Sequence, residues 1–205
     1  MRIGRTGRGS ALVAGLTAIF MMLSTGGASA QSWFPWDWGT ESTQGGQGGG
    51  SGRSLISFPS TYAPGQIIVS FNDRRLYLVH RRGQAISYPI AAPRPQSRWQ
   101  GGMRISRKMV NPPWTPTASM RAENPNLPSY VPGGHPRNPL GNRALYLGSS
   151  LYRIHGTDAP WTIGQSVSKG CIRMFNADVA DLYNRVGVGT KVTVNWRNYQ
   201  YASAY

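Results

Sequence analysis

The sequence has few of the residues that build disulfide frameworks and metal sites. Only one of its 205 residues is cysteine, which excludes an intramolecular disulfide, and its three histidines and seven acidic residues show no metal-ligand spacing. We therefore expect no cofactor and no metal. Because the acidic residues face 22 lysines and arginines, the formal net charge is +15, and the partner is expected to be anionic.

The sequence also lacks long helical patterns. Its 26 glycines and 15 prolines interrupt helical hydrogen bonding, and its seven tryptophans and ten tyrosines favour strands. This composition argues against a helical bundle and predicts a mostly β fold. An apolar content of 40% is enough for one main domain with accessory segments outside its core.

The apolar run at residues 11–23 is too short for a membrane span. It has 13 residues, against about 20 needed to cross a bilayer. Three arginines precede it, and Ala28-Ser29-Ala30 follows with the small residues that signal peptidase accepts. We predict a cleavable secretory signal over residues 1–30. Its removal leaves a charge of +12 on an exported protein, which favours an anionic envelope surface as partner and makes nucleic acid an improbable one.

Residues 31–59 are predicted to precede the folded domain. They hold a tryptophan-rich stretch at 33–38 and a glycine-rich and serine-rich stretch at 45–52, a composition that cannot repay the entropy of folding. We interpret 31–59 as a tryptophan-rich segment with a flexible linker. The domain is then expected over 60–197, and the tail 198–205 carries no usable signal.

Alternating apolar residues predict a meander of short strands in the domain. The expected strands cover residues 67–69, 76–79, 84–90, 145–147, 151–154 and 192–196. Between 91 and 140 the sequence is crowded with Pro, Gly, Trp and Asn, which predicts an irregular excursion that builds a binding surface.

One helix is predicted after residue 175. Asn176 can cap its start, Gly187 can end it, and apolar residues at helical spacing give it one packing face. These apolar residues are Val179, Leu182, Tyr183 and Val186.

The single cysteine is a candidate nucleophile. A lone cysteine is more often a small buried hydrophobe, but Gly170 leaves room for an incoming carbonyl beside Cys171, and Lys169 and Arg173 can stabilise a thiolate. The positive end of the helix that starts at Asn176 can add to this effect. Lowering a thiol pKa from about 8.5 to about 7 needs only ~2 kcal/mol, so we expect a lowered pKa here.

A cysteine nucleophile needs a base, and the candidates are His80, His135 and His155. We interpret His80 as a solvent-exposed residue in a turn. His135 lies in a loop where it could contact substrate. His155 ends a predicted strand 16 residues before Cys171, so a hairpin-like return would bring its imidazole to the thiol. Either the carbonyl of Gly156 or the carboxylate of Asp158 could accept the other ring proton, and the sequence leaves both open.

Taken together, these motifs resemble a known family of cysteine enzymes. Ile154-His155-Gly156-Thr157, Ser168-Lys169-Gly170-Cys171-Ile172-Arg173-Met174 and the segment 176–194 resemble the catalytic domain of the L,D-transpeptidases (YkuD-like). The resemblance extends over about 64–196. It implies a mostly β, sandwich-like fold with one short helix after the catalytic cysteine.

The resemblance also implies a reaction and its site. Cys171 would attack the carbonyl of the L-centre of diaminopimelate in a peptidoglycan tetrapeptide stem, release D-Ala and hold the stem as a thioester. His155 would take the thiol proton and Gly156 would orient the imidazole through its carbonyl. The side-chain amine of another diaminopimelate would then resolve the thioester into a 3-3 cross-link in the periplasm, at the cell wall. The implied substrate contacts are Arg173, Gly170, Lys169, Ser168 and Thr157.

The chain departs from the family pattern at one position. The common motif has a second histidine where this sequence has Lys169, and a lysine cannot replace its base or donor role unchanged. Three other functions stay open. They are an L,D-carboxypeptidase that uses water as acceptor, an enzyme that attaches a protein to peptidoglycan, and a non-catalytic wall-binding module.

Overall fold

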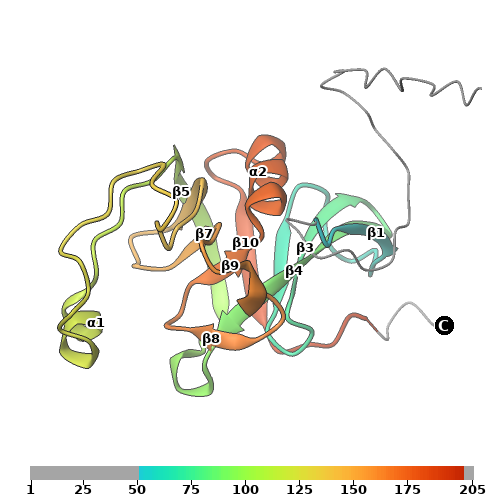
Figure 1. Ribbon diagram of the computed structural model, residues 1–205. Helices are drawn as coiled ribbons and strands as arrows, with labels where there is room; N and C mark the ends of the chain where they lie inside the picture. Colours follow the sequence, from blue (N-terminus) through green and yellow to red (C-terminus); the bar gives the residue numbers. More distant parts are fainter. Residues whose placement is uncertain (1–50, 201–205) are drawn as a thin grey trace, which may run out of the picture. The chain divides into compact units, whose positions relative to one another are not determined.

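The computed structural model describes residues 51–200 (Figure 1). The predicted signal, the tryptophan-rich stretch, most of the glycine-rich stretch and residues 201–205 lie outside the described residues. Within 51–200, no helix combines the length and the apolar character that a membrane crossing needs.

Residues 51–200 form ten strands and two α-helices. The strands are β1 (Ser54–Ser57), β2 (Ile67–Ser70), β3 (Arg75–Arg81), β4 (Gln84–Pro93), β5 (Gly101–Val110), β6 (Arg143–Leu147), β7 (Arg153–His155), β8 (Ser166–Ser168), β9 (Ile172–Met174) and β10 (Lys191–Asn195). The α-helices are α1 (Ala118–Glu123) and α2 (Asn176–Arg185), and single 3-10 turns cover Pro95–Ser97 and Pro160–Thr162.

The strands form a sheet that closes on itself. Their order is β1-β4-β3-β2-β10-β5-β6-β7-β9, and β9 also pairs with β4, so the path returns to its second strand. The expected mostly β fold is confirmed. The strands form one continuous path of paired strands, because β9 pairs with β4. The strand β8 pairs with β4 outside this path, and α2 contacts β6 and β7.

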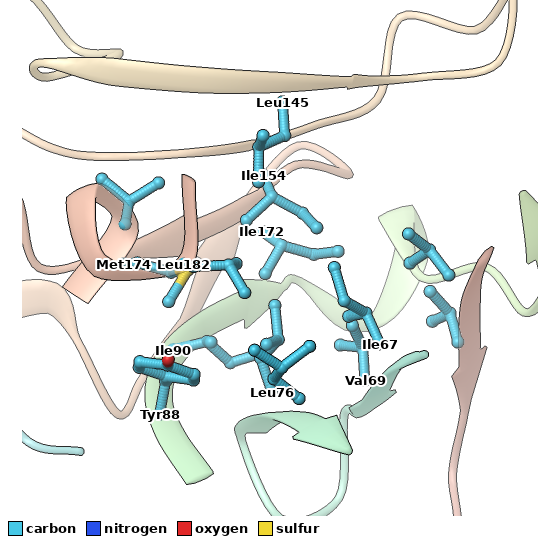
Figure 2. Close-up of a cluster of buried hydrophobic side chains, with 14 of the residues drawn as sticks. Ile67, Val69, Leu76, Tyr88, Ile90, Leu145, Ile154, Ile172, Met174 and Leu182 are labelled. Atoms are coloured by element: carbon cyan, nitrogen blue, oxygen red, sulfur yellow. The ribbon is translucent and has the colours of Figure 1, made fainter. Parts of the chain in front are cut away.

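The main core fills the space between these strands and α2 (Figure 2). Alternation places Ile67 and Val69 of β2 in this core, while Ile68 belongs to a second apolar cluster with Phe58 and Tyr77. Apolar groups on both faces make β2 buried along its whole length. Strands that are buried on both faces have continuous apolar sequences, which is why the sequence predicted this strand.

The expectation of an irregular excursion over 91–140 is wrong in part, because this stretch contains β5 and α1. Of the residues in β5 only Ile105 is buried, and the apolar alternation is limited to Met103 and Ile105, which is too short to predict a strand of this length. The helix α1 has no buried residue and therefore no apolar stripe. It projects beside the sheet, at the left of Figure 1.

Folded structure extends beyond the predicted boundaries of 60 and 197. The strand β1 lies in the predicted linker and pairs with β4. Ahead of it, the hydroxyl of Ser51 donates to the Asp178 carboxylate over 2.5 Å. On the other side, Tyr199 is buried against Phe58 and Tyr77, so part of the predicted tail completes the second apolar cluster.

The predicted helix is present as α2, but its ends differ from the prediction. Phe175 stands at the N-cap position, and Asn176 is the first helical residue, whose side chain is used elsewhere. The helix ends at Arg185 with Val186 at the C-cap, ahead of Gly187. The expected packing face is correct, since Val179 and Leu182 are fully buried.

Candidate active site

The strands β7 and β9 bring the predicted nucleophile and base together. They run parallel, with Ile154 opposite Ile172 and His155 opposite Arg173. Both isoleucines point into the core (Figure 2), so their neighbours along each strand face the opposite way. The expected hairpin-like return is therefore wrong: a crossover at 156–171 makes the two strands parallel, and Cys171 precedes β9 on the same face as His155.

This face forms a wall of a cavity of about 600 Å³. Cys171, His155, Arg153 and Arg173 all line it, together with Lys169 and Ser168. The 91–140 stretch also lines the cavity, including Trp114 and the start of α1. The long stretch does contribute a surface to the site, as its composition predicted.

The buried imidazole of His155 is held as a neutral base. Its Nδ1 lies 2.6 Å from the carbonyl oxygen of Gly156, and since a carbonyl only accepts, Nδ1 carries the proton. Burial and the nearby Arg173 cation lower the pKa of His155 to about 3. The unprotonated Nε2 is then available to accept a proton. Of the two orienting groups that the sequence left open, the Gly156 carbonyl makes the bond.

The side chain of Asn176 fixes the loop that carries this carbonyl. Its Oδ1 accepts from the backbone N–H of Thr157 at 3.1 Å and of Asn142 at 3.3 Å, and its Nδ2 donates to the carbonyl of Thr157 at 2.8 Å. A Cβ on Gly156 would stand 2.1 Å from Asn176 Oδ1, so this approach requires glycine. The start of α2 thereby orients His155 through Gly156.

The thiol of Cys171 does not have the lowered pKa that its neighbours suggested. Burial raises its pKa, and this effect outweighs the cations around it. The sulfur donates to the carbonyl oxygen of Leu151 at 3.7 Å, as a protonated thiol does. Cys171 is therefore a thiol at rest, and a base must take its proton during attack.

Arg153 is the cation that most directly opposes this rise, and the sequence reasoning gave it no role. Its Nη1 donates to the same Leu151 carbonyl at 3.1 Å, which places the guanidinium beside the thiol. Against burial, the backbone N–H of Arg153 lowers the pKa of Cys171 most, followed by the Arg153 guanidinium and then by Arg173. The sequence could have indicated Arg153, because this residue lies two positions before His155 and therefore points to the same face of the strand.

Sequence comparison decides the family. Residues 64–194 match the family YkuD, the L,D-transpeptidase catalytic domain. The chain belongs to this family. It is 40% identical over 145 residues to the probable L,D-transpeptidase YbiS of Escherichia coli K12, which covers 67% of this chain and 46% of that protein. It is 35% identical over 148 residues to the putative L,D-transpeptidase YkuD of Bacillus subtilis 168, which covers 71% of this chain and 76% of that protein.

The chain spans about half the length of the first of these relatives. Among solved structures, an L,D-transpeptidase from Mycobacterium smegmatis superposes with a TM-score of 0.49 at 19% identity, covering 63% of this chain and 58% of that one. The family assignment rests on the sequence matches and not on this superposition.

In this L,D-transpeptidase domain, Lys169, the residue at the departing position, forms an ion pair with an acidic residue. The ammonium of Lys169 lies 2.6 Å from the carboxylate of Glu123, the last residue of α1, and Arg94 approaches the same carboxylate at 3.8 Å. Arg153 and Arg173, and not Lys169, are the cations that lower the pKa of Cys171. The expectation that Lys169 stabilises the thiolate is therefore replaced by a role in holding α1 at the cavity.

The turn before Cys171 requires a glycine. Gly170 has φ +122°, and a Cβ there would meet Tyr152 Cε1 at 2.5 Å. Tyr152 stacks on Trp99 at 4.5 Å, and Trp99 Nε1 donates to the Gly170 carbonyl at 2.9 Å. Ser168, another predicted contact, donates its hydroxyl to the Cys171 carbonyl. These contacts fix the backbone on which the sulfur stands.

The two remaining predicted substrate contacts differ in position. Arg173 lines the cavity, and its Nη1 donates to the Thr162 hydroxyl at 2.8 Å. Burial lowers the pKa of Arg173 and the carboxylate of Asp158 raises it. Thr157, by contrast, is buried outside the cavity lining, where its hydroxyl accepts from the Ala159 N–H at 2.9 Å. Its predicted contact with substrate finds no support in this geometry.

The other two histidines lie away from the sulfur. His80 is exposed near the end of β3, and His135 lines a neighbouring cavity. Within 51–200, no group of three or more His, Cys, Asp or Glu side chains could hold a metal ion.

Proposed function

We propose that this protein is a periplasmic L,D-transpeptidase that cross-links peptidoglycan through a thioester on Cys171. The observation that carries the proposal is that a protonated thiol and a neutral imidazole line the same cavity. The imidazole is fixed in the tautomer that leaves Nε2 free. Membership in the L,D-transpeptidase family supplies the substrate class.

In the acylation half-reaction, Cys171 Sγ attacks the carbonyl carbon of the L-centre of diaminopimelate in a tetrapeptide donor. The thiol proton passes to His155 Nε2 as the S–C bond forms. Collapse of the tetrahedral intermediate breaks the C–N bond to the terminal D-Ala, whose nitrogen takes the proton from the imidazole. The products are free D-Ala, a thioester and a neutral His155.

In the transfer half-reaction, the side-chain amine of a second diaminopimelate attacks the thioester carbon. His155 Nε2 accepts a proton from this amine, the new C–N bond forms, and the C–S bond breaks. The proton returns to the sulfur, which restores the thiol. A 3-3 cross-link results, and the enzyme ends in its starting state.

The low pKa of His155 favours the steps in which the imidazolium gives up its proton, and it makes the neutral ring a weaker base toward the thiol and the acceptor amine. An imidazolium that forms next to Arg173 in a buried site is a strong acid and returns its proton readily to the leaving group. Backbone N–H groups around Gly170 and Cys171 are proposed to hold the oxyanion. The guanidinium of Arg173, which faces the same cavity, suits a stem-peptide carboxylate.

The charge of the chain fits an envelope location. Cleavage of the predicted signal leaves a formal charge of +12, which would concentrate the enzyme near cell-wall carboxylates and lipid phosphates. The periplasmic location is part of the proposal and is checked by fractionating cells that produce the full chain.

Product analysis tests the proposal. Purified protein lacking residues 1–30 is incubated with disaccharide tetrapeptides that contain diaminopimelate, and products are identified by mass spectrometry. We expect released D-Ala together with 3-3 linked dimers, and neither product with Cys171→Ser. Release of D-Ala without dimers would replace the transpeptidase with an L,D-carboxypeptidase, and the absence of both would favour a wall-binding module.

A further inference from the structure

A second cavity adjoins the catalytic one and has no assigned role. It has a volume of about 480 Å³ and is formed mainly by residues 127–139. Trp114 and Pro139 line both cavities, so the two cavities adjoin at these side chains. A ligand bound in the second cavity therefore lies next to whatever occupies the first.

This second cavity is preformed by contacts within the chain. The backbones of Trp114 and Val131 exchange two hydrogen bonds of 2.9 and 2.8 Å. Behind them the buried Asn138 donates from Nδ2 to the carbonyls of Pro112 at 2.9 Å and Pro132 at 3.1 Å. Because these bonds close the loop on itself, little ordering is required when a ligand binds.

The lining of the second cavity offers unused donors. Arg137 is exposed, and its guanidinium makes no hydrogen bond or ion pair with any residue in 51–200. The backbone N–H of Arg137 donates to His135 Nδ1 at 3.1 Å, which places the ring proton of neutral His135 on Nε2 as a further donor. Tyr130, at 55% exposure, adds an apolar face beside them.

A transpeptidase needs a site for two peptides at once. The donor stem occupies the catalytic cavity as a thioester, so the acceptor must approach from a neighbouring surface. An acceptor stem carries carboxylates and an aliphatic side chain that ends in the reacting amine. An unpaired guanidinium beside an aromatic ring matches the first two features, since guanidinium binds carboxylate through paired hydrogen bonds.

We propose that the second cavity is the acceptor subsite, where Arg137 and His135 bind a carboxylate of the acceptor stem. The side-chain amine then extends past Trp114 and Pro139 toward the thioester on Cys171. This inference rests on the proposed function, because it assumes that an amine resolves the acyl-enzyme. It assigns Arg137 to the second half-reaction only.

Separate measurement of the two half-reactions tests this assignment. Arg137→Ala is compared with the unchanged protein and with Arg82→Ala, which removes an exposed arginine in the turn between β3 and β4, outside both cavities. The acceptor probe is a soluble stem tripeptide ending in diaminopimelate. We expect Arg137→Ala to raise the KM for this tripeptide about tenfold or more. The rate of acylation by the donor should stay within about twofold, and Arg82→Ala should change neither value.

Direct binding separates failure of this inference from failure of the proposed function. Tripeptide binding is measured by calorimetry on Cys171→Ala, which cannot form a thioester, and on Cys171→Ala combined with Arg137→Ala. Binding that is lost only in the double variant supports the subsite, even if the unchanged protein forms no acyl-enzyme. Equal binding by the two variants, no binding by either, or an acylation rate that falls as far as cross-linking would each overturn the assignment.

Discussion

At the scale of single residues, the pKa of the Cys171 thiol depends on which cations lie near it. Burial holds Cys171 as a thiol, while Arg153 and Arg173 oppose that effect. Arg153 and the sulfur both donate to the carbonyl of Leu151, so the guanidinium is in position to stabilise the charge that develops during attack. Lys169 is engaged with Glu123 instead.

Removing the Arg153 guanidinium should make the thiol harder to ionise, while the backbone N–H of residue 153, which lowers the pKa of Cys171 most, stays in place. We expect Arg153→Ala to shift the pH dependence of Cys171 alkylation by iodoacetamide to higher pH, and to slow acylation at neutral pH about tenfold. Arg153→Lys should keep part of the effect, because it retains the charge but not the planar guanidinium.

Lys169→Ala is the matched comparison for Arg153. Lys169→Ala should leave the pH dependence of Cys171 alkylation unchanged and should only slow turnover. An unchanged profile for Arg153→Ala, or an equal shift for Lys169→Ala, would contradict the role given to Arg153.

The sequence predicted Cys171 and His155 as nucleophile and base, but it did not predict the groups that tune their pKa values. Cys171 and His155 stand in short motifs whose chemistry can be recognised locally. The ion pair of Lys169 joins segments far apart in the chain, and no local pattern reveals it. Likewise, the effect of burial on the thiol depends on packing around the cavity rather than on the charges beside it in sequence.

At the scale of elements, α2 and α1 each hold one side of the site. The sequence predicted that Asn176 would cap α2, since asparagine is a common N-cap residue. In the structure, its amide joins the loops that carry Thr157 and Asn142, where sequence neighbours give no hint of a partner. Gly156 lies against this amide, so α2 and the loop after His155 form one unit.

Asn176→Ala should loosen this unit. Two backbone N–H groups and one carbonyl lose their partner, so we expect the free energy of unfolding to fall by about 1–3 kcal/mol. Acylation should fall with it, because His155 is oriented by the loop that Asn176 holds. Asn184→Ala, on the exposed side of α2, is the control and should have little effect on either quantity in urea unfolding and acylation assays. Equal stability for both variants would show that the three bonds contribute nothing.

The contact between α1 and the loop before the nucleophile can be tested by charge reversal. The ammonium of Lys169 lowers the pKa of Glu123, as expected for a close ion pair. Glu123→Gln should raise the donor KM about twofold to fivefold, because the carboxylate is exposed and screened. Glu123→Lys should raise it further, and adding Lys169→Glu should restore part of the loss. The absence of any restoration would argue against a functional pair.

At the scale of the whole molecule, the closed sheet explains which parts of the fold were predictable. Strands in its centre carry apolar residues toward the core, and the sequence predicted them. The strand β5 has mostly exposed side chains, and β8 and β9 are three residues each, too short for a periodic pattern. The parallel pairing of β7 with β9 follows only from the complete strand order.

Burial of a neutral histidine should make stability depend on pH. The pKa of His155 is about 3 when folded, below its ordinary value of 6.5, so the unfolded chain binds the extra proton between these values. Its contribution to stability is complete above pH 6.5 and is lost as the pH falls toward 3, by up to about 1.4 kcal/mol per pH unit.

Urea unfolding of the unchanged protein and of His155→Gln at several pH values isolates this contribution. The raised pKa of Asp178 acts in the opposite direction, but it is common to both proteins and cancels in the difference. We expect the stability of the unchanged protein to fall more steeply with acid than that of the variant. Parallel curves would show that His155 is not buried as a neutral base.

The most direct measurement is the intact mass of the protein after brief exposure to a tetrapeptide donor without acceptor. A thioester on Cys171 should add the mass of the donor less D-Ala, and peptide mapping should place it on that residue. The adduct should be absent from Cys171→Ser and His155→Ala. A donor that is consumed without any adduct or any dependence on Cys171, or an adduct that forms equally well in His155→Ala, would contradict the thiol and imidazole mechanism.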